Sequence, residues 1–180
     1  SFLRQDPNIV MVGEIRDTET ADLAIQAALT GHQVFSTLHT NTASGSPPRL
    51  LDMGVEPFLL TSALNAVLGQ RVVRKICPQC RVEFNPPPEV VENIKAVLGR
   101  LLPASLGTHL ALFKGRGCKF CGDSGYLGRI GIFEVLNVSG KVRELIMKNA
   151  SASEIKNVGV GEGMTTMFED GFNKVKNGYT

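Results

Sequence analysis

The stretch Asn8-Ile9-Val10-Met11-Val12-Gly13-Glu14 decides the fold of this chain. Its run of four apolar residues, most of them β-branched, predicts a buried strand of a parallel sheet. Gly13 and Glu14 end the run, and the carboxyl end of such a strand faces the crevice in which open α/β sheets bind their ligands. We therefore expect Glu14 at a ligand-facing edge. Many α/β domains end a strand in Gly-Glu, so a purely structural Glu14 stays open.

The residues that follow predict a helix and then a second strand. Residues 17–29 begin with a capping, acidic first turn and continue rich in alanine and leucine, and Gly31 stops the helix. Residues 32–41 are β-rich in the middle and polar at their outgoing end. A strand, a helix and a strand in this order imply a parallel crossover, so Glu14 and His39 should leave the sheet on the same edge.

A carboxylate and a histidine at one sheet edge suit nucleotide chemistry. In P-loop nucleoside triphosphatases an acidic residue at this place holds the Mg²⁺ shell or polarises the attacking water, which is the Walker B role. His39 could donate a hydrogen bond to a phosphate oxygen and so report whether the γ-phosphate is present. A lone histidine is more often a structural residue, and both interpretations of His39 stay open at this point.

Four cysteines form two close pairs, Cys77-Pro-Gln-Cys80 and Cys118-Lys-Phe-Cys121, with 37 residues between the pairs. A two-residue gap lets both thiolates of one turn face one ion, and two such turns supply the four ligands of a tetrahedral structural zinc site. Two disulfides would suit a secreted protein, and a redox centre needs only one such pair, so both fit less well. An iron-sulfur cluster uses the same ligands, and the spacing does not exclude it.

The segment between the cysteine pairs is more than a loop. After three prolines, apolar residues recur at helical spacing and predict one amphipathic helix: Val90, Val91, Ile94, Val97, Leu98 and Leu101. Metal binding at such a site is worth on the order of 10–16 kcal/mol and doubles as folding energy, so we expect residues 74–135 to be unfolded without metal. The lobe would staple the fold, and an additional role in docking a partner stays open.

The remaining residues predict further helices and one strand. Residues 56–69 fit a helix whose core stripe is Leu60, Ala63, Leu64, Val67 and Leu68. Residues 130–135 predict a strand that returns to the main body. Residues 139–177 look helical, with Ser153 as a cap and a last helix over residues 164–176.

The charges of the chain are unevenly distributed. Residues 1–73 carry a net charge of −3 and residues 74–180 a net charge of +5. This basic excess is modest for a nucleic-acid module, and two Tyr and no Trp leave few rings to stack on bases. The uncharged stretch 23–48 is interrupted by polar side chains, 57–70 is too short to span a bilayer, and no signal peptide is recognisable. We expect a soluble, cytosolic chain that binds no nucleic acid.

Longer motifs resemble one family. The segment 3–17, LRQDPNIVMVGEIRD, is similar to the signature of the secretion and pilus-assembly ATPases, and the segment 30–41, TGHQVFSTLHTN, resembles their histidine box. The four-cysteine lobe resembles the extension of the type II secretion and type IV pilus assembly ATPases, whereas pilus-retraction relatives lack it. The resemblance covers essentially the whole chain.

This resemblance implies an architecture and a set of site residues. The fold class would be α/β, with the carboxyl part of a RecA-like P-loop ATPase domain in residues 1–73, a zinc lobe in residues 74–135 and helices in residues 136–180. The matching site residues are Glu14 as the Walker B acid, His39 as the γ-phosphate sensor, Gly13 and Arg16 as neighbouring nucleotide-site positions, and Cys77, Cys80, Cys118 and Cys121 as zinc ligands.

The resemblance also implies partners and a location. The parent would be a homo-hexamer that hydrolyses ATP with Mg²⁺ and drives pilin or pseudopilin assembly. It would lie in the cytoplasm, peripheral to the inner membrane, against a membrane platform protein.

The sequence departs from the family pattern in three places. Asn8 stands where the motif usually has Asp, and Pro47-Pro48 predicts that the helix leading to Met53 begins near Pro48. Residues 1–180 contain no G-x-x-x-x-G-K-[ST] phosphate loop, which in the family lies upstream. We therefore expect a fragment of a longer motor, inactive alone. The alternatives are a non-catalytic zinc-containing module that docks on the platform and a zinc-ribbon nucleic-acid binder.

Overall fold

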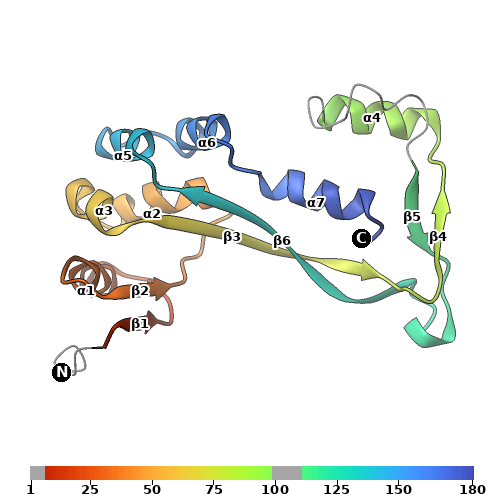
Figure 1. Cartoon of the computed structure of the whole chain (residues 1–180), viewed down its shortest axis with the longest axis horizontal. Coiled ribbons are helices and arrows are strands. Elements are labelled where there is room, and N and C mark those ends of the chain that lie inside the picture. The colour runs from red at the N-terminus through yellow and green to blue at the C-terminus, as the bar shows by residue number, and fades with distance from the viewer. Residues whose placement is uncertain (1–6, 99–110) are drawn as a thin grey trace. The chain divides into compact units, whose positions relative to one another are not determined.

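The computed structural model describes residues 7–98 and 111–180, which form two compact units. Unit 1 comprises Ser1–Gly69 and Glu134–Thr165, and unit 2 comprises Gln70–Phe133 and Thr166–Thr180. The chain changes from one unit to the other within the two long strands β3 and β6, drawn in Figure 1, and again after residue 165. Residues 136–165 thus group with the N-terminal part of the chain, and residues 166–180 group with the cysteine segment.

The N-terminal part of unit 1 is a strand, a helix and a strand, as predicted. Strand β1 (Ile9–Val12) pairs in parallel with β2 (Gln33–Ser36), with Val10 opposite Val34. Helix α1 (Thr18–Leu29) connects them, and the Asp17 side chain caps it by accepting a hydrogen bond from Thr20 N at 2.8 Å. In Figure 1 these elements lie side by side. Val10 is buried while Ile9 and Met11 are exposed, so the predicted burial of β1 is found on one face only among the described residues.

Two short helices follow, and the second ends earlier than predicted. Helix α2 (Ser46–Asp52) begins two residues before Pro48, with prolines in its first turn, where their missing N–H groups cost nothing. Helix α3 covers Pro57–Ala63 instead of residues 56–69, because the backbone turns extended at Leu64 and continues into β3 (Ala66–Ile76).

The predicted core stripe of α3 is correct except at its end. Leu60 is 1% exposed, and Ala63, Leu64 and Val67 pack against the same core, but Leu68 is 60% exposed. A strand turns successive side chains to opposite faces, so Val67 can face the core while Leu68 points away from it.

Helices α5 (Gly140–Met147) and α6 (Ala152–Gly161) complete unit 1. They contribute Val142, Ile146 and Ile155 to a core that also includes Leu60 and Leu136. Ser151, and not the predicted Ser153, caps α6: Ser151 Oγ accepts from Glu154 N, and the Glu154 carboxylate accepts from Ser151 N at 2.8 Å. This reciprocal pair is the capping box, which fixes where the helix begins.

Strands β3 and β6 (Tyr126–Asn137) form a two-stranded antiparallel sheet. Hydrogen bonds close both of its ends: Val138 N donates to Asn65 O at 3.0 Å, and Cys77 N donates to Gly125 O at 3.0 Å. The predicted strand 130–135 is therefore the middle of a longer one.

Unit 2 holds the segment between the cysteine pairs. Strands β4 (Arg81–Phe84) and β5 (Leu112–Gly115) pair antiparallel, and α4 (Pro88–Leu98) forms the predicted amphipathic helix. Leu101 of the predicted stripe lies outside the described residues. Val91 and Leu112 form a small apolar core, against which Phe84, Ile94 and Val175 pack.

The last helix, α7 (Met167–Lys176), belongs to unit 2. The Asp170 carboxylate accepts from Phe133 N at 2.8 Å and pairs with Lys174 one turn along α7. The hydrogen bond from Phe133 ties the helix to β6, and the ion pair lies within α7. Within residues 7–98 and 111–180, no helix is both long enough and apolar enough to cross a bilayer.

Candidate functional site

The parallel pairing brings Glu14 and His39 together, as predicted from the order of the elements, and Arg16 joins them from the loop after β1. Glu14 follows β1 and His39 follows β2, so both stand at the carboxyl end of the sheet. Glu14 Oε2 lies 2.6 Å from Arg16 Nε and 3.1 Å from His39 Nε2. The Glu14 side chain is 34% exposed and that of His39 is 83% exposed, so the group is accessible from solvent.

The two partners of Glu14 act on its protonation. The hydrogen bond from Arg16 lowers the pKa of Glu14 below its usual range; partial burial opposes this, and the hydrogen bond from His39 lowers the pKa further. Glu14 is therefore a carboxylate at neutral pH. An ionised carboxylate only accepts hydrogen bonds, so His39 Nε2 carries the hydrogen in this contact. His39 Nδ1 is then the ring atom left to meet a ligand.

The backbone around the site is held by hydrogen bonds between the two strand ends. Ile15 N donates to Thr37 O at 2.9 Å, and Thr37 Oγ1 donates to Gly13 O at 2.7 Å. These bonds extend the β1–β2 pairing past the strands and fix Glu14 relative to the residues that lead to His39. A Cβ at Gly13 would meet no atom within 4 Å among the described residues, so the space beside this glycine is open.

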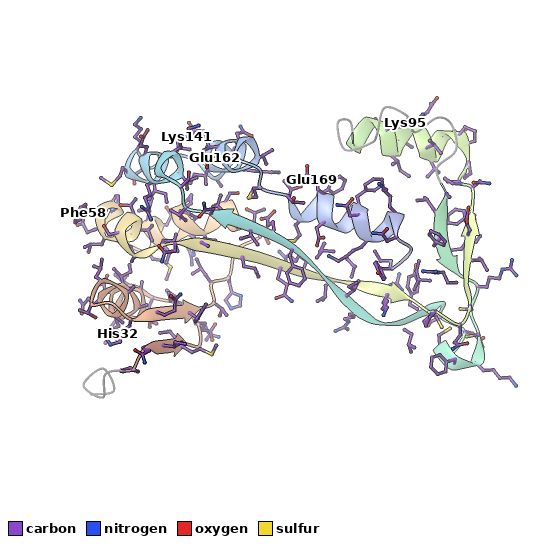
Figure 2. All side chains as sticks on the ribbon, in the orientation of Figure 1. His32, Phe58, Lys95, Lys141, Glu162 and Glu169 are labelled. Carbon is purple, nitrogen blue, oxygen red and sulfur yellow. The ribbon has the colours of Figure 1, made fainter. Side chains whose placement is uncertain are left out.

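The second cluster consists of the four cysteines, which converge at the far end of β3. Their Sγ atoms all lie within 4.8 Å of one another, and Figure 2 shows yellow sulfur atoms gathered there. Cys77 Sγ is 3.9 Å from Cys118 Sγ, Cys80 Sγ is 3.9 Å from Cys121 Sγ, and Cys118 Sγ is 3.7 Å from Cys121 Sγ. The predicted group of four ligands is thus assembled in space.

The separations between these sulfur atoms distinguish the alternatives. A disulfide needs about 2.05 Å between sulfur atoms, and all four cysteines are free. A tetrahedron built from metal–sulfur bonds of about 2.3 Å has edges of about 3.8 Å. The Cys77–Cys118, Cys80–Cys121 and Cys118–Cys121 separations match this length, and all the Sγ atoms lie within 4.8 Å of one another. An iron-sulfur cluster places several atoms between its ligands and would hold them further apart. The donor set and its size therefore fit one ion with four thiolate ligands.

Tight turns hold the two cysteine pairs. Cys80 N donates to Cys77 O, Cys121 N donates to Cys118 O, and Cys118 N points at Cys121 Sγ from 3.3 Å. Gly115 and Gly125 lie on either side of the second pair, where their backbones come close together: a Cβ at Gly115 would lie only 2.0 Å from Gly125 O. Only glycine permits this close approach of two backbones.

The thiols have unequal proton affinities. Burial raises the pKa of the Cys80 thiol to about 11. For Cys121, burial is outweighed by hydrogen bonds from the N–H groups of Cys118 and Gly125 and from neighbouring thiols, which lower its pKa to about 6. Because thiolates are the form that binds metal, loading the site at neutral pH must release protons.

Glu134 is a buried carboxylate on β6, in a stretch where the sequence pattern predicted only a strand. It is 5% exposed, and its Oε1 accepts a hydrogen bond from Ala43 N at 2.6 Å. The strand period could have indicated it, because Glu134 shares a face of β6 with the buried Leu136. A carboxylate on a buried face requires a partner.

Comparison with known proteins identifies the family of the chain. The family described as "Type II/IV secretion system protein" matches residues 1–180. The type IV pilus assembly ATPase PilB of Thermus thermophilus is 48% identical over all of this chain and 20% of its own length. The type II secretion system ATPase E of Vibrio cholerae is 44% identical over all of this chain and 34% of its own length. The chain thus spans a fifth to a third of these relatives.

Solved structures agree on the fold. The pilus retraction motor PilT with bound ADP superimposes with a TM-score of 0.62 at 26% identity, covering 99% of this chain and 38% of that one. The ATPase DotB of Yersinia pseudotuberculosis gives a TM-score of 0.62 at 21% identity, covering 99% and 36%. The predicted fold class, the carboxyl part of an α/β ATPase domain that carries a four-cysteine lobe, is confirmed.

Proposed function

Since the chain belongs to the Type II/IV secretion system protein family, we propose that it forms the part of an ATP-hydrolysing motor that carries the catalytic carboxylate and a metal-stapled lobe. The observation that carries this proposal is the meeting of Glu14, Arg16 and His39 at the carboxyl end of two parallel strands. Relatives named as ATPases match the whole chain, which supports an ATPase role for the parent protein.

Glu14 would serve as the acceptor for the attacking water. Its lowered pKa keeps it ionised at neutral pH, and its position at a strand end leaves it exposed to a ligand. A carboxylate in this state can orient a water molecule and take its proton as the bond to phosphorus forms. Mg²⁺ bound together with ATP would neutralise the charge of the phosphates.

His39 and Arg16 would respond to the nucleotide. Both donate to Glu14 Oε2, so a phosphate that attracts either side chain must compete with this carboxylate. The presence of a γ-phosphate would then alter the hydrogen bonding of Glu14. Gly13, whose side is open, would let the phosphates approach the strand end.

The cysteine group would hold a structural Zn²⁺ through Cys77, Cys80, Cys118 and Cys121. When bound, this ion would supply a fixed tetrahedral anchor for otherwise loop-rich backbone and no chemistry with the nucleotide. Its four ligands come from the turns that precede β4 and β6. The cysteine group would therefore have a structural role that is distinct from the role of the Glu14 site.

We also propose an oligomeric state and a location for the parent protein. It would act as a cytoplasmic homo-hexamer, peripheral to the inner membrane, on a membrane platform protein of a secretion or pilus machine. The names of the relatives support either machine equally. The 180 residues alone would show negligible turnover, because a phosphate-binding loop is not among their motifs.

The test is Glu14→Gln in the full-length protein that contains this sequence. We expect hydrolysis to fall by on the order of a hundredfold or more, because the amide cannot accept the proton of water. Nucleotide affinity should stay within about threefold of the original, since the shape of the site is kept. The matched control is Glu19→Gln, an exposed carboxylate in the first turn of α1, which should leave both quantities unchanged. Turnover of Glu14→Gln equal to that of the control would refute the proposed role.

A further inference from the structure

The loop that carries His39 is anchored on both sides. Before it, Thr37 Oγ1 donates to Gly13 O, next to Glu14. After it, Thr40 Oγ1 donates to Thr42 O at 3.1 Å and lies 3.0 Å from Ser46 Oγ, in the first turn of α2. The position of His39 therefore depends on where the start of α2 is held.

The start of α2 lacks a local cap. The short 3-10 turn Ala43–Gly45 leads into α2. Thr42, at the capping position, has no side-chain hydrogen bond from a backbone N–H of the turn, and its Oγ1 lies 3.3 Å from Ser44 Oγ instead. Ala43 is completely buried, and Ser44 and Ser46 are nearly so. A buried N–H group without an acceptor is strongly unfavourable, so this turn needs a partner from elsewhere.

Glu134 supplies that partner from a distant part of the sequence. Its Oε1 lies 2.6 Å from Ala43 N, and the two residues are 91 positions apart in the chain. The face of β6 that carries Glu134 continues with Leu136 and leads to Val138, both fully packed in the core of unit 1. The buried end of β6 thus places one carboxylate against the first N–H of the turn, and a hydrogen bond to a charged group is strong.

We propose that Glu134 is a positioning residue that holds His39 against Glu14 by binding Ala43 N–H. Its action passes through the turn at Ala43 and the Thr40–Ser46 contact, and it touches no substrate. The inference rests on the proposed role of the Glu14 site, and it adds a residue that no motif used above contains.

Three substitutions at position 134 test separately the length of the side chain, its charge and its oxygen acceptor. Glu134→Gln keeps the length and a carbonyl acceptor, Glu134→Asp keeps the charge but withdraws it by one methylene, and Glu134→Met keeps the length without an oxygen. The matched control is Glu162→Met at the C-terminal end of α6, an exposed position labelled in Figure 2. If Glu134→Met does not fold, the same measurements on Glu134→Asp test the proposal.

The experiment measures ATP turnover and peptide hydrogen exchange in the full-length protein. In Glu134→Asp and Glu134→Met, exchange should rise in residues 37–46 while peptides of α5 and α6 keep their protection. Turnover should fall by on the order of ten- to a hundredfold, because small misplacements near reacting groups are costly. Glu134→Gln and Glu162→Met should behave like the original protein. The double variant Glu134→Asp/His39→Ala should hydrolyse ATP no more slowly than His39→Ala alone. The losses of turnover caused by residues that act as a unit do not add up.

Two results would overturn the proposal. One is unchanged exchange in residues 37–46 of folded Glu134→Asp, which would show that the bond does not hold the loop. The other is additive loss of turnover in the double variant, which would show that Glu134 does not act through His39. Full activity of His39→Ala with raised exchange in Glu134→Asp would instead refute the catalytic role of His39 and leave the anchoring of the loop supported.

Discussion

Removing the metal should unfold one part of the chain and spare the other. The four-thiolate site is worth on the order of 10–16 kcal/mol when occupied. Among the described residues of unit 2, the small apolar cluster beside α4 has Val91 and Leu112 as its buried members, each worth about 1.5–3 kcal/mol. The metal is therefore the larger contribution, and residues 77–84 and 112–125 should lose their order without it. The core of unit 1 draws on none of these residues.

The assay is hydrogen exchange of the 180-residue chain before and after treatment with a chelator, together with elemental analysis. We expect one zinc per chain, and rapid exchange in the cysteine-bearing peptides after its removal. Peptides of α1, α5 and α6 should exchange as before. Cys121→Ser should reproduce the effect of the chelator, whereas Phe120→Ser, an exposed neighbour that is not a ligand, should not. Protected cysteine peptides in a verified metal-free sample would refute this reasoning.

Three further predictions concern packing and charge. Leu60→Ala should lower the free energy of unfolding by about 2–5 kcal/mol and Leu68→Ala by less than about 0.5 kcal/mol, measured by urea denaturation. Equal losses would contradict the finding that Leu60 is buried and Leu68 is exposed. Arg16→Gln should raise the pKa of Glu14 in a carbon NMR titration, and an unmoved pKa would show that Arg16 is not its main partner. The hydrogen bond from Lys174 lowers the pKa of Asp170. The ion pair therefore stabilises α7 at pH values above the usual carboxyl pKa, and this stabilisation is lost as the pH falls through the lowered pKa. Lys174→Met should cost about 1 kcal/mol at neutral pH and little in acid, while the exposed Lys176→Met should be neutral at both; a cost that persists in acid would exclude the ion pair.

Sequence reasoning predicted the local α/β unit and the two clusters because their signals are local. The apolar run 9–12, the Asp17 cap and the polar residues 37–41 each appear within a few positions of the chain, and parallel pairing then places Glu14 beside His39. The cysteine spacing similarly predicted a four-ligand group before any contact was known.

The errors arose where long-range pairing decides local structure. Helical and strand patterns overlap in residues 64–69, and pairing with β6, some seventy positions later, selects the strand. Glu134 was missed because its partner Ala43 is distant in sequence. The cap of α6 is a local exception: Ser151 and Ser153 could both cap, and Ser151 does so because Glu154 completes the capping box.

The most direct measurement is a structure of the full-length protein with Mg²⁺ and a non-hydrolysable ATP analogue. We expect the Glu14 carboxylate to lie within hydrogen-bond reach, about 2.6–3.2 Å, of the water in line with the γ-phosphate or of a water bound to Mg²⁺. We also expect His39 to approach the same phosphate. A γ-phosphate bound away from the Glu14 edge, with Glu14 and His39 paired as they are without nucleotide, would contradict it.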